Sequence, residues 1–121
     1  MCALTEHTSD ISPTATWYPP GGPVHWFTCA SDAKTIYWVD ATELRYSLRC
    51  AAVWARGPNS IRNIIRSYTK SSGGSVRKER STERYSIPGD DQYTVMLNDD
   101  GLFGVACSAW SNFDIKCTGR Y

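Results

Sequence analysis

Proton transfer near neutral pH most often depends on histidine, and this chain of 121 residues has only two, His7 and His25. No histidine occurs after residue 25. Paired carboxylates stand at 90–91 and 99–100, next to glycines, so we interpret them as turn residues rather than catalytic acids. The chain also lacks a Gly-rich phosphate loop, a G-x-S-x-G motif and metal-ligand spacing. The sequence therefore predicts neither an enzyme nor a metal or other cofactor.

The thiols are the next candidates for chemistry. Five cysteines stand at positions 2, 29, 50, 107 and 117, and none has the CxxC spacing of a zinc site. Disulfides are the simpler interpretation and imply an oxidising compartment, whereas buried free thiols in a cytosolic protein are the alternative. Because five is odd, one thiol should remain, and Cys2 in the polar leading segment is the candidate.

Basic residues gather in the middle third of the chain. Residues 45–84 carry ten basic and two acidic side chains, although the whole chain has a net charge of only +1. Such a segment could neutralise phosphates, or it could be a solvated loop kept soluble by its charge. Trp110 could add stacking to RNA, or could be core packing. The candidate RNA- or partner-binding residues are Arg62, Arg66, Lys70, Arg77, Lys78, Arg80, Arg84 and Trp110.

These residues need a scaffold, and the first half of the sequence predicts a hairpin followed by a helix. The β-branched and aromatic runs at 24–29 and 35–40 favour two paired strands. Asp40 and Glu43 have capping-box spacing, and a Gly-Pro pair follows residue 56, so we predict a helix over 41–56. Its apolar stripe would consist of Leu44, Leu48, Ala51, Ala52 and Ala55.

The second half predicts mainly antiparallel strands. The isoleucine-rich stretch 61–68 fits either a strand or a second helical turn. The NDDG stretch at 98–101 predicts a hairpin turn, because Asp and Gly tolerate positive φ. The expected fold class is α+β, with one domain at 24–121 after an irregular extension at 1–23. Further strands are expected at 84–88, 93–97, 102–108 and 113–117.

Two stretches resemble a known family. The FTC at 27–29 and the run TVMLNDDGLFGVACSAWSNFDIKCT at 94–118 are similar to fungal guanyl-specific ribonucleases, and more closely to the RNase-like effectors of powdery mildew fungi, called RALPH effectors. The chain departs from these effectors in having 26 residues before Phe27. The resemblance implies one α-helix packed on a twisted antiparallel β-sheet, preceded by an N-terminal hairpin. It also implies a Cys29–Cys117 disulfide, and a Cys50–Cys107 bridge would then join the helix to the sheet.

The resemblance further implies a ribonuclease scaffold without its catalytic groups. Asn59, Arg84, Thr94 and Ser108 occupy the positions that match the family's catalytic residues, and none supplies the required acid, base or phosphate arginine. An active ribonuclease would need a rearranged site, for which Glu83 and His25 are the candidates.

We therefore expect a catalytically inactive secreted effector. It would be monomeric, would not enter a membrane, and would be delivered into host cells. Its partners would be host plant proteins, including an immune receptor of the NLR class, or RNA bound through residues 62–84. No apolar run reaches the roughly 20 residues of a membrane span. Because the first ten residues lack signal-peptide features, a secreted protein would be present here in its mature form.

Overall fold

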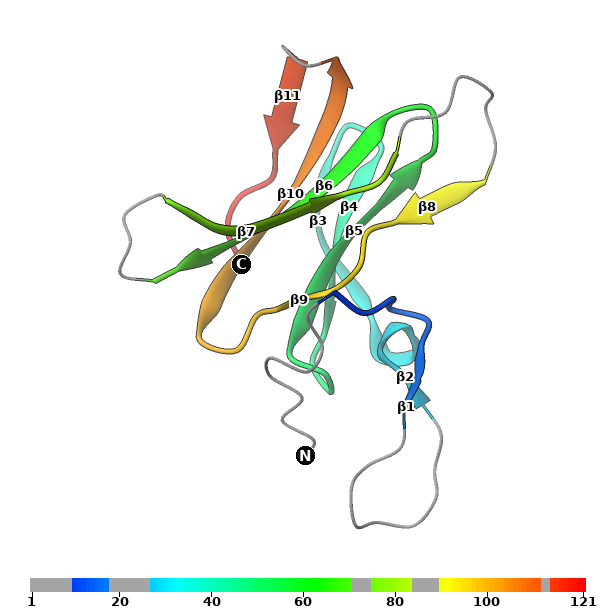
Figure 1. Ribbon diagram of the computed structural model, residues 1–121, viewed down its shortest axis with the longest axis vertical. Coiled ribbons are helices and arrows are strands. Elements are labelled where there is room, and N and C mark those ends of the chain that lie inside the picture. Colours follow the sequence, from blue (N-terminus) through cyan, green and yellow to red (C-terminus); the bar gives the residue numbers. More distant parts are fainter. Residues whose placement is uncertain (1–9, 18–26, 71–74, 84–89, 112–113) are drawn as a thin grey trace.

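Strands form nearly all of the regular structure in the computed structural model (Figure 1). It describes residues 10–17, 27–70, 75–83, 90–111 and 114–121. The helical segment in these ranges is a short 3₁₀ turn, η2 (Cys29–Asp32). The strands are β1 (Thr16–Trp17), β2 (Phe27–Thr28), β3 (Lys34–Val39), β4 (Thr42–Ser47), β5 (Ala52–Pro58), β6 (Arg62–Thr69), β7 (Val76–Ser81), β8 (Asp91–Tyr93), β9 (Leu97–Asn98), β10 (Leu102–Ser111) and β11 (Asp114–Cys117).

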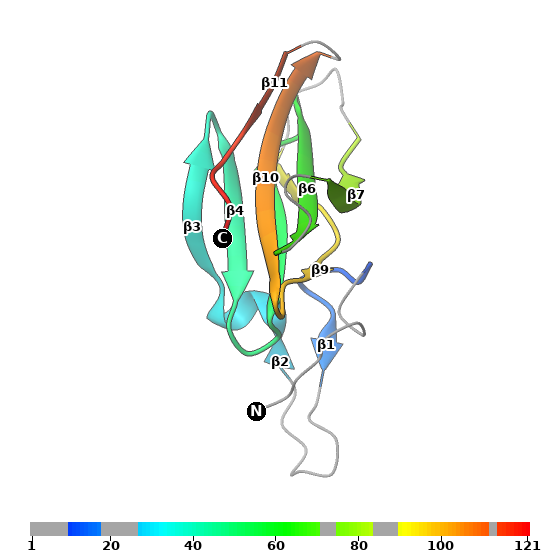
Figure 2. The same ribbon diagram turned by 90° about the vertical axis from the view of Figure 1, so that its left-hand side faces the viewer.

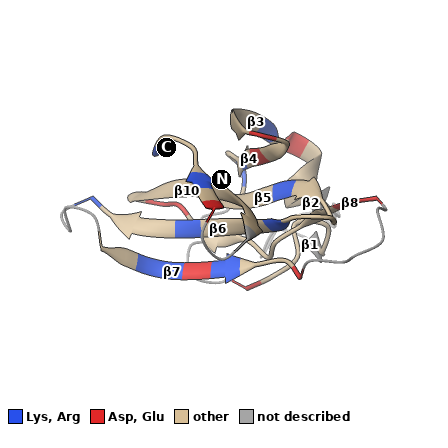
Figure 3. Cartoon of the chain, turned by 90° about the horizontal axis from the view of Figure 1, so that it is seen from above, with Lys and Arg blue, Asp and Glu red and all other residues tan. Residues whose placement is uncertain are grey.

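Two antiparallel sheets make up the body of the molecule. The β10 sheet has the strand order β11-β10-β6-β7, and Figure 2 shows β10, β6 and β7 side by side. The β4 sheet has the order β3-β4-β5-β8, and β9 also pairs with β5. Figure 3 looks along the long axis and shows β3 of one sheet and β7 of the other on opposite sides of the molecule. The arrangement is a β-sandwich, with β1 and β2 forming a separate small ladder.

The main core lies between the two sheets, because alternate residues of each strand point inward. Its members come from β4, β5, β6, β9 and β10, so it joins both sheets into one unit. These buried residues are Leu44, Val53, Ala55, Ile65, Leu97 and Ala106.

The predicted helix over 41–56, and with it the α+β fold class, is wrong. That segment forms β4, a turn and β5, and the turn residues Asp40 and Ala51 have φ values of 50° and 48°. Asp40 therefore lies in the turn between β3 and β4 instead of capping a helix. Leu48, which the predicted helix would have buried, is 67% exposed. Apolar residues at this spacing also fit two short strands, and pairing with neighbours on both sides outweighs the weak local helical preference.

The predicted pairing of 24–29 with 35–40 is also wrong for the described part. β3 pairs with β4, and β2 pairs with β1, while residues 24–26 lie outside the described ranges. Asp10 of the predicted extension donates its backbone N–H to the Met96 carbonyl at 2.8 Å. The 10–17 segment therefore packs on the domain.

The later strands agree better with expectation. The ambiguous 61–68 stretch is the strand β6, and β10 and β11 form the expected final hairpin. The 98–101 turn instead connects β9 in one sheet with β10 in the other, although Gly101 does adopt a positive φ of 70°. The strand expected at 93–97 is split between β8 and β9, and the one expected at 84–88 lies outside the described residues.

Two disulfides confirm that the chain is disulfide-bonded, but both predicted pairings are wrong. Cys29 bonds to Cys50, and Cys107 bonds to Cys117. The β10–β11 register places Cys107 directly opposite Cys117, so these thiols meet across one hairpin. The other bridge ties η2 to the turn after β4, inside a small cluster with Trp54 and Met96.

Candidate binding surface

A line of four side chains crosses the outer face of the β4 sheet, one from each strand. Trp38 pairs with Glu43, Glu43 with Arg56, and Arg56 with Tyr93. Directly opposed residues of antiparallel strands lie on the same face, so these four form one continuous line. We call it the cross-strand row.

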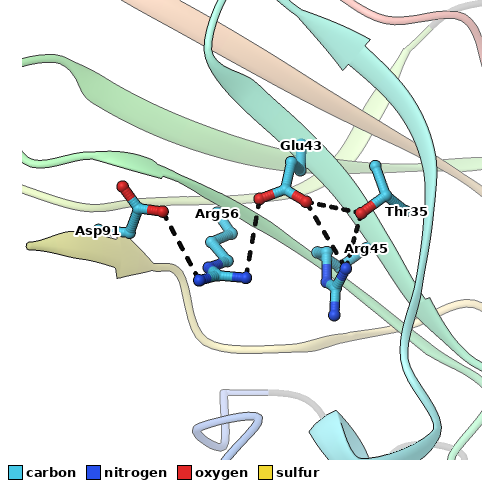
Figure 4. Close-up of polar contacts among 5 residues, drawn as sticks. All are labelled: Thr35, Glu43, Arg45, Arg56 and Asp91. Carbon is cyan, nitrogen blue, oxygen red and sulfur yellow. Dashed lines mark hydrogen bonds and ion pairs between the residues drawn. The ribbon is translucent and has the colours of Figure 1, made fainter.

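Ion pairs and hydrogen bonds hold the middle of this face in place (Figure 4). Thr35 Oγ1 donates to Glu43 Oε1 at 2.6 Å, and Arg45 Nη1 donates to Thr35 Oγ1 at 2.6 Å. Arg45 Nη1 also lies 3.6 Å from Glu43 Oε1. Arg56 lies 3.9 Å from Glu43 Oε2 and 3.6 Å from Asp91 Oδ2. The Glu43 side chain is only 9% exposed, so the arginines are fixed around a nearly buried carboxylate.

Strand alternation and one bulge place these residues. In β4, Leu44 points into the core, which directs Glu43 and Arg45 outward. An irregularity between Thr35 and Tyr37 shifts the β3 register, so that Trp38 comes opposite Glu43. Without this shift, Trp38 and Thr35 would lie on opposite faces of β3.

The row has aromatic ends and a charged centre. Trp38 is 62% exposed and Tyr93 is 42% exposed, so both of these large aromatic side chains contact solvent. Trp54 of β5 also points to the outer face of the β4 sheet, but the cluster around the Cys29–Cys50 bridge covers it. Exposed Trp, Tyr and Arg are the residue types that contribute most to protein–protein binding.

Sequence reasoning missed this row. The alternation of polar and apolar residues at 42–47 was available as a signal, but the helical interpretation of 41–56 hid it. The cross-strand neighbours could not be found from local spacing, since Tyr93 lies 55 positions after Trp38.

The predicted basic cluster is divided in the structure. Arg66 pairs with Glu79 of β7 at 2.6 Å, and Arg80 pairs with Asp10. The β6–β7 register places Glu79 opposite Arg66 and Arg80 opposite the core residue Ile65, so the two arginines lie on opposite faces of the sheet. Figure 3 shows an acidic residue between the basic ones along β7.

The other members of that predicted set are scattered. Arg62 is exposed on β6, Lys70 lies over the Phe103 ring at 5.5 Å, and Arg84 is outside the described residues. Arg77 and Lys78 lie on β7, and both have interactions within the structure. Trp110, near the end of β10, is 46% exposed.

The positions that match the ribonuclease catalytic residues do not form an accessible site in the described part of the chain. Ser108 is fully buried, and Thr94 is buried with its Oγ1 accepting the Ala55 N–H at 3.0 Å. Asn59 lies in the turn after β5, while Arg84 and His25 are outside the described residues. Glu83 is exposed. Ser108 follows the core residue Ala106 by two positions on β10, so its side chain faces the β4 sheet.

Comparison with protein-family models, with curated proteins and with solved structures finds no match to this chain. The resemblance to RNase-like effectors therefore stays a prediction. Within the described ranges, no helix is long and apolar enough to cross a membrane. The same residues contain no group of three or more potential metal ligands.

Proposed function

We propose that this protein is a non-catalytic binding module that recognises another protein through the outer face of its β4 sheet. The observation that carries the proposal is the cross-strand row, with exposed aromatic ends and a charged centre fixed by neighbouring side chains. Because Arg45 and Arg56 are already held in place, a partner would lose little conformational entropy in contacting them.

The balance of charge favours a protein over RNA. Glu43 and Asp91 accompany Arg45 and Arg56 on this face, so it has no excess of positive charge. RNA binding depends largely on uncompensated cations, and the basic segment at 62–84 uses Arg66 and Arg80 in internal ion pairs.

The cellular setting is proposed on less direct grounds. Two disulfides suit an oxidising compartment, and we propose a secreted protein on that basis. Action as a pathogen effector on plant proteins stays a prediction, since it depends on the resemblance at 27–29 and 94–118. The helix-on-sheet fold that the resemblance implied is absent from the described residues.

Site-specific photo-crosslinking in plant extract tests the proposal. A crosslinker at position 41, which is exposed in the turn between β3 and β4 two residues before Glu43, should capture one defined protein with the oxidised chain. Trp38→Ala and Tyr93→Ala should each reduce that capture at least tenfold. Ile115→Ala is the matched control, because Ile115 is also 42% exposed but belongs to the β10 sheet.

Equal loss with Ile115→Ala, or capture unchanged by both row variants, would contradict the proposal. A ribonuclease assay on the same preparation should give background cleavage. Guanosine-specific cleavage abolished by Glu83→Gln would replace the binding function with an enzymatic one.

A further inference from the structure

The two disulfides differ in their access to solvent. Cys29 and Cys50 are both fully buried and belong to one small apolar cluster. In the other bridge Cys107 is fully buried, whereas Cys117 is exposed. Exposed disulfides are reduced more readily than buried ones, because a thiolate must reach one of the two sulfurs to open the bond. An external thiol therefore has better access to the Cys107–Cys117 bridge than to the Cys29–Cys50 bridge.

Cys117 ends a strand at the edge of the β10 sheet. Figure 1 shows β11 beside β10, and all four residues of β11 are exposed. A reductant can approach such a strand from its outer side without displacing another strand. Beyond the bridge, the Thr118 N–H donates to the Ala106 carbonyl at 2.8 Å, so the chain stays bonded to β10 on that side of the disulfide. Opening the bridge would therefore loosen β11 and leave the core between the sheets in place.

An arginine lies next to the sulfur of Cys117. Arg66 of β6 is paired with Val105 of β10. Cys117 is paired with Cys107, two positions after Val105, so Arg66 and Cys117 flank β10 on the same face. Arg66 Nη1 lies 3.7 Å from Cys117 Sγ, and Arg66 Nε donates to Glu79 Oε2 at 2.6 Å. A guanidinium beside a cysteine sulfur favours the thiolate over the thiol, although Glu79 offsets part of this charge.

We infer that the Cys107–Cys117 bridge is a thiol–disulfide exchange site, which a dithiol reductant opens at Cys117 while the Cys29–Cys50 bridge stays closed. One thiolate of the dithiol attacks Cys117 Sγ, the S–S bond breaks, and Cys107 takes up a proton as a thiol. The second thiol of the reductant loses its proton and attacks the reductant sulfur bonded to Cys117. This step closes the reductant's own disulfide and releases Cys117 as a thiolate. Two electrons pass from the dithiol to the protein.

Arg66 acts in the second of these steps. Cys117 is then the leaving group, and a thiolate that is stabilised by a neighbouring cation leaves faster. The same contact favours the reduced form at equilibrium. The inference goes beyond the proposed function and does not depend on it, because the bridge belongs to the β10 sheet and the cross-strand row to the β4 sheet.

A redox titration of the full chain tests the inference, with Cys2→Ser to remove the remaining thiol. The protein is equilibrated at pH 7 in mixtures of reduced and oxidised dithiothreitol, free thiols are alkylated, and mass spectrometry of the digest reports each bridge separately. Half-reduction of Cys107–Cys117 should need a ratio of reduced to oxidised reagent at least about tenfold lower than that for Cys29–Cys50. Equal ratios, or earlier reduction of Cys29–Cys50, would overturn the inference.

Two variants separate the charge of Arg66 from its ion pair. Arg66→Gln removes the guanidinium beside Cys117, so half-reduction of the bridge should need a ratio about threefold higher or more. Glu79→Gln keeps Arg66 and removes the carboxylate that offsets its charge, so the ratio should fall. If the ion pair only held the strands together, both variants would make reduction easier. Easier or unchanged reduction of Arg66→Gln would therefore overturn the inference.

A matched control and a trapping experiment complete the test. Arg62→Gln changes an exposed arginine of the same strand and should leave the ratio unchanged. Brief exposure of the oxidised chain to glutathione, a monothiol, followed by acid quenching should place glutathione on Cys117. Glutathione found mainly on Cys107, or an effect of Arg62→Gln as large as that of Arg66→Gln, would contradict the proposed attack at Cys117 beside Arg66.

Discussion

Asp99 is buried in a way that makes the protein sensitive to pH. It lies in the connection from β9 to β10, and its Oδ1 atom is buried without a hydrogen-bond partner. Burial raises the pKa of Asp99 to about 7, the positive charge of Lys70 opposes that rise, and the nearby Asp100 adds to it. The carboxyl group is thus protonated in the folded protein at mildly acidic pH.

This predicts a stability that falls as the pH rises through neutrality. The unfolded chain has an Asp pKa near 3.8, so the folded state binds the extra proton between that value and about 7. The stabilisation that protonated Asp99 contributes is fully present below pH 3.8 and is lost as the pH rises through about 7. Asp99→Asn should raise the free energy of unfolding at pH 8 by at most about 4 kcal/mol, at about 1.4 kcal/mol per pKa unit.

Urea unfolding at pH 5, 6, 7 and 8 measures this effect. The wild type should lose stability across that range relative to Asp99→Asn, while Asp114→Asn should follow the wild type. Parallel pH curves for the wild type and Asp99→Asn would show that the carboxylate is already ionised in the fold.

Glu43 is the second residue with an individual effect to test. Glu43→Ala removes the acceptor shared by Thr35, Arg45 and Arg56, and should lower the free energy of unfolding by about 1–3 kcal/mol. Glu79→Ala is the comparison, because Glu79 is 46% exposed and accepts from Arg66. It should cost less than about 1 kcal/mol, as exposed pairs usually do. If chemical denaturation gave equal losses of stability for Glu43→Ala and Glu79→Ala, the network around Glu43 would stabilise the fold no more than an exposed ion pair does.

At the scale of elements, the spacing between the sheets depends on Gly104 of β10. A Cβ added there would lie 2.8 Å from Val53 Cγ2 of β5 and 3.3 Å from Asp99 Oδ1. Gly104→Ala should therefore force the sheets apart and cost about 1–3 kcal/mol in thermal or urea unfolding. Gly119→Ala is the control, because its added Cβ would meet its nearest atom, in the Tyr37 ring, at 3.9 Å. If Gly104→Ala left the stability unchanged, β5 and β10 would have to lie farther apart than this structure places them.

At the scale of the whole molecule, two local disulfides stabilise a small sandwich. They close loops of 21 and 10 residues, each worth roughly 3 kcal/mol in the chain-entropy model. Mass spectrometry of the unreduced protein should find peptides linking Cys29 to Cys50 and Cys107 to Cys117. The double variant Cys29→Ser/Cys50→Ser should lower stability by roughly that amount while leaving the other bridge intact. A Cys29–Cys117 peptide would contradict this topology.

Much of the local structure could be predicted from the chain. The final hairpin follows from the β-branched and apolar residues at 102–108 and 113–117, and Gly101 takes the positive φ that its turn residues indicate. The prediction failed at 41–56 because the same apolar positions satisfy a helix and a hairpin. Partners far along the chain decide between them, as Arg56 does by pairing with Tyr93.

The candidate surface lay beyond prediction for the same reason. Trp38, Glu43, Arg56 and Tyr93 come from four strands, and only their register places them in one line. The cationic residues at 62–84 looked like one patch in the sequence. Strand alternation sends them to opposite faces, and the ion pairs of Arg66 and Arg80 compensate part of their charge.

By itself, the sequence determined the turn-forming glycines and the β-prone segments near its end, because these depend on residue type and near neighbours. It favoured disulfides over free thiols without settling the choice. Only the tertiary structure decided which cysteines meet, that the middle segment is a hairpin, and which side chains share an exposed face. Those outcomes depend on contacts between residues distant in the chain, where burial between two sheets outweighs local preference.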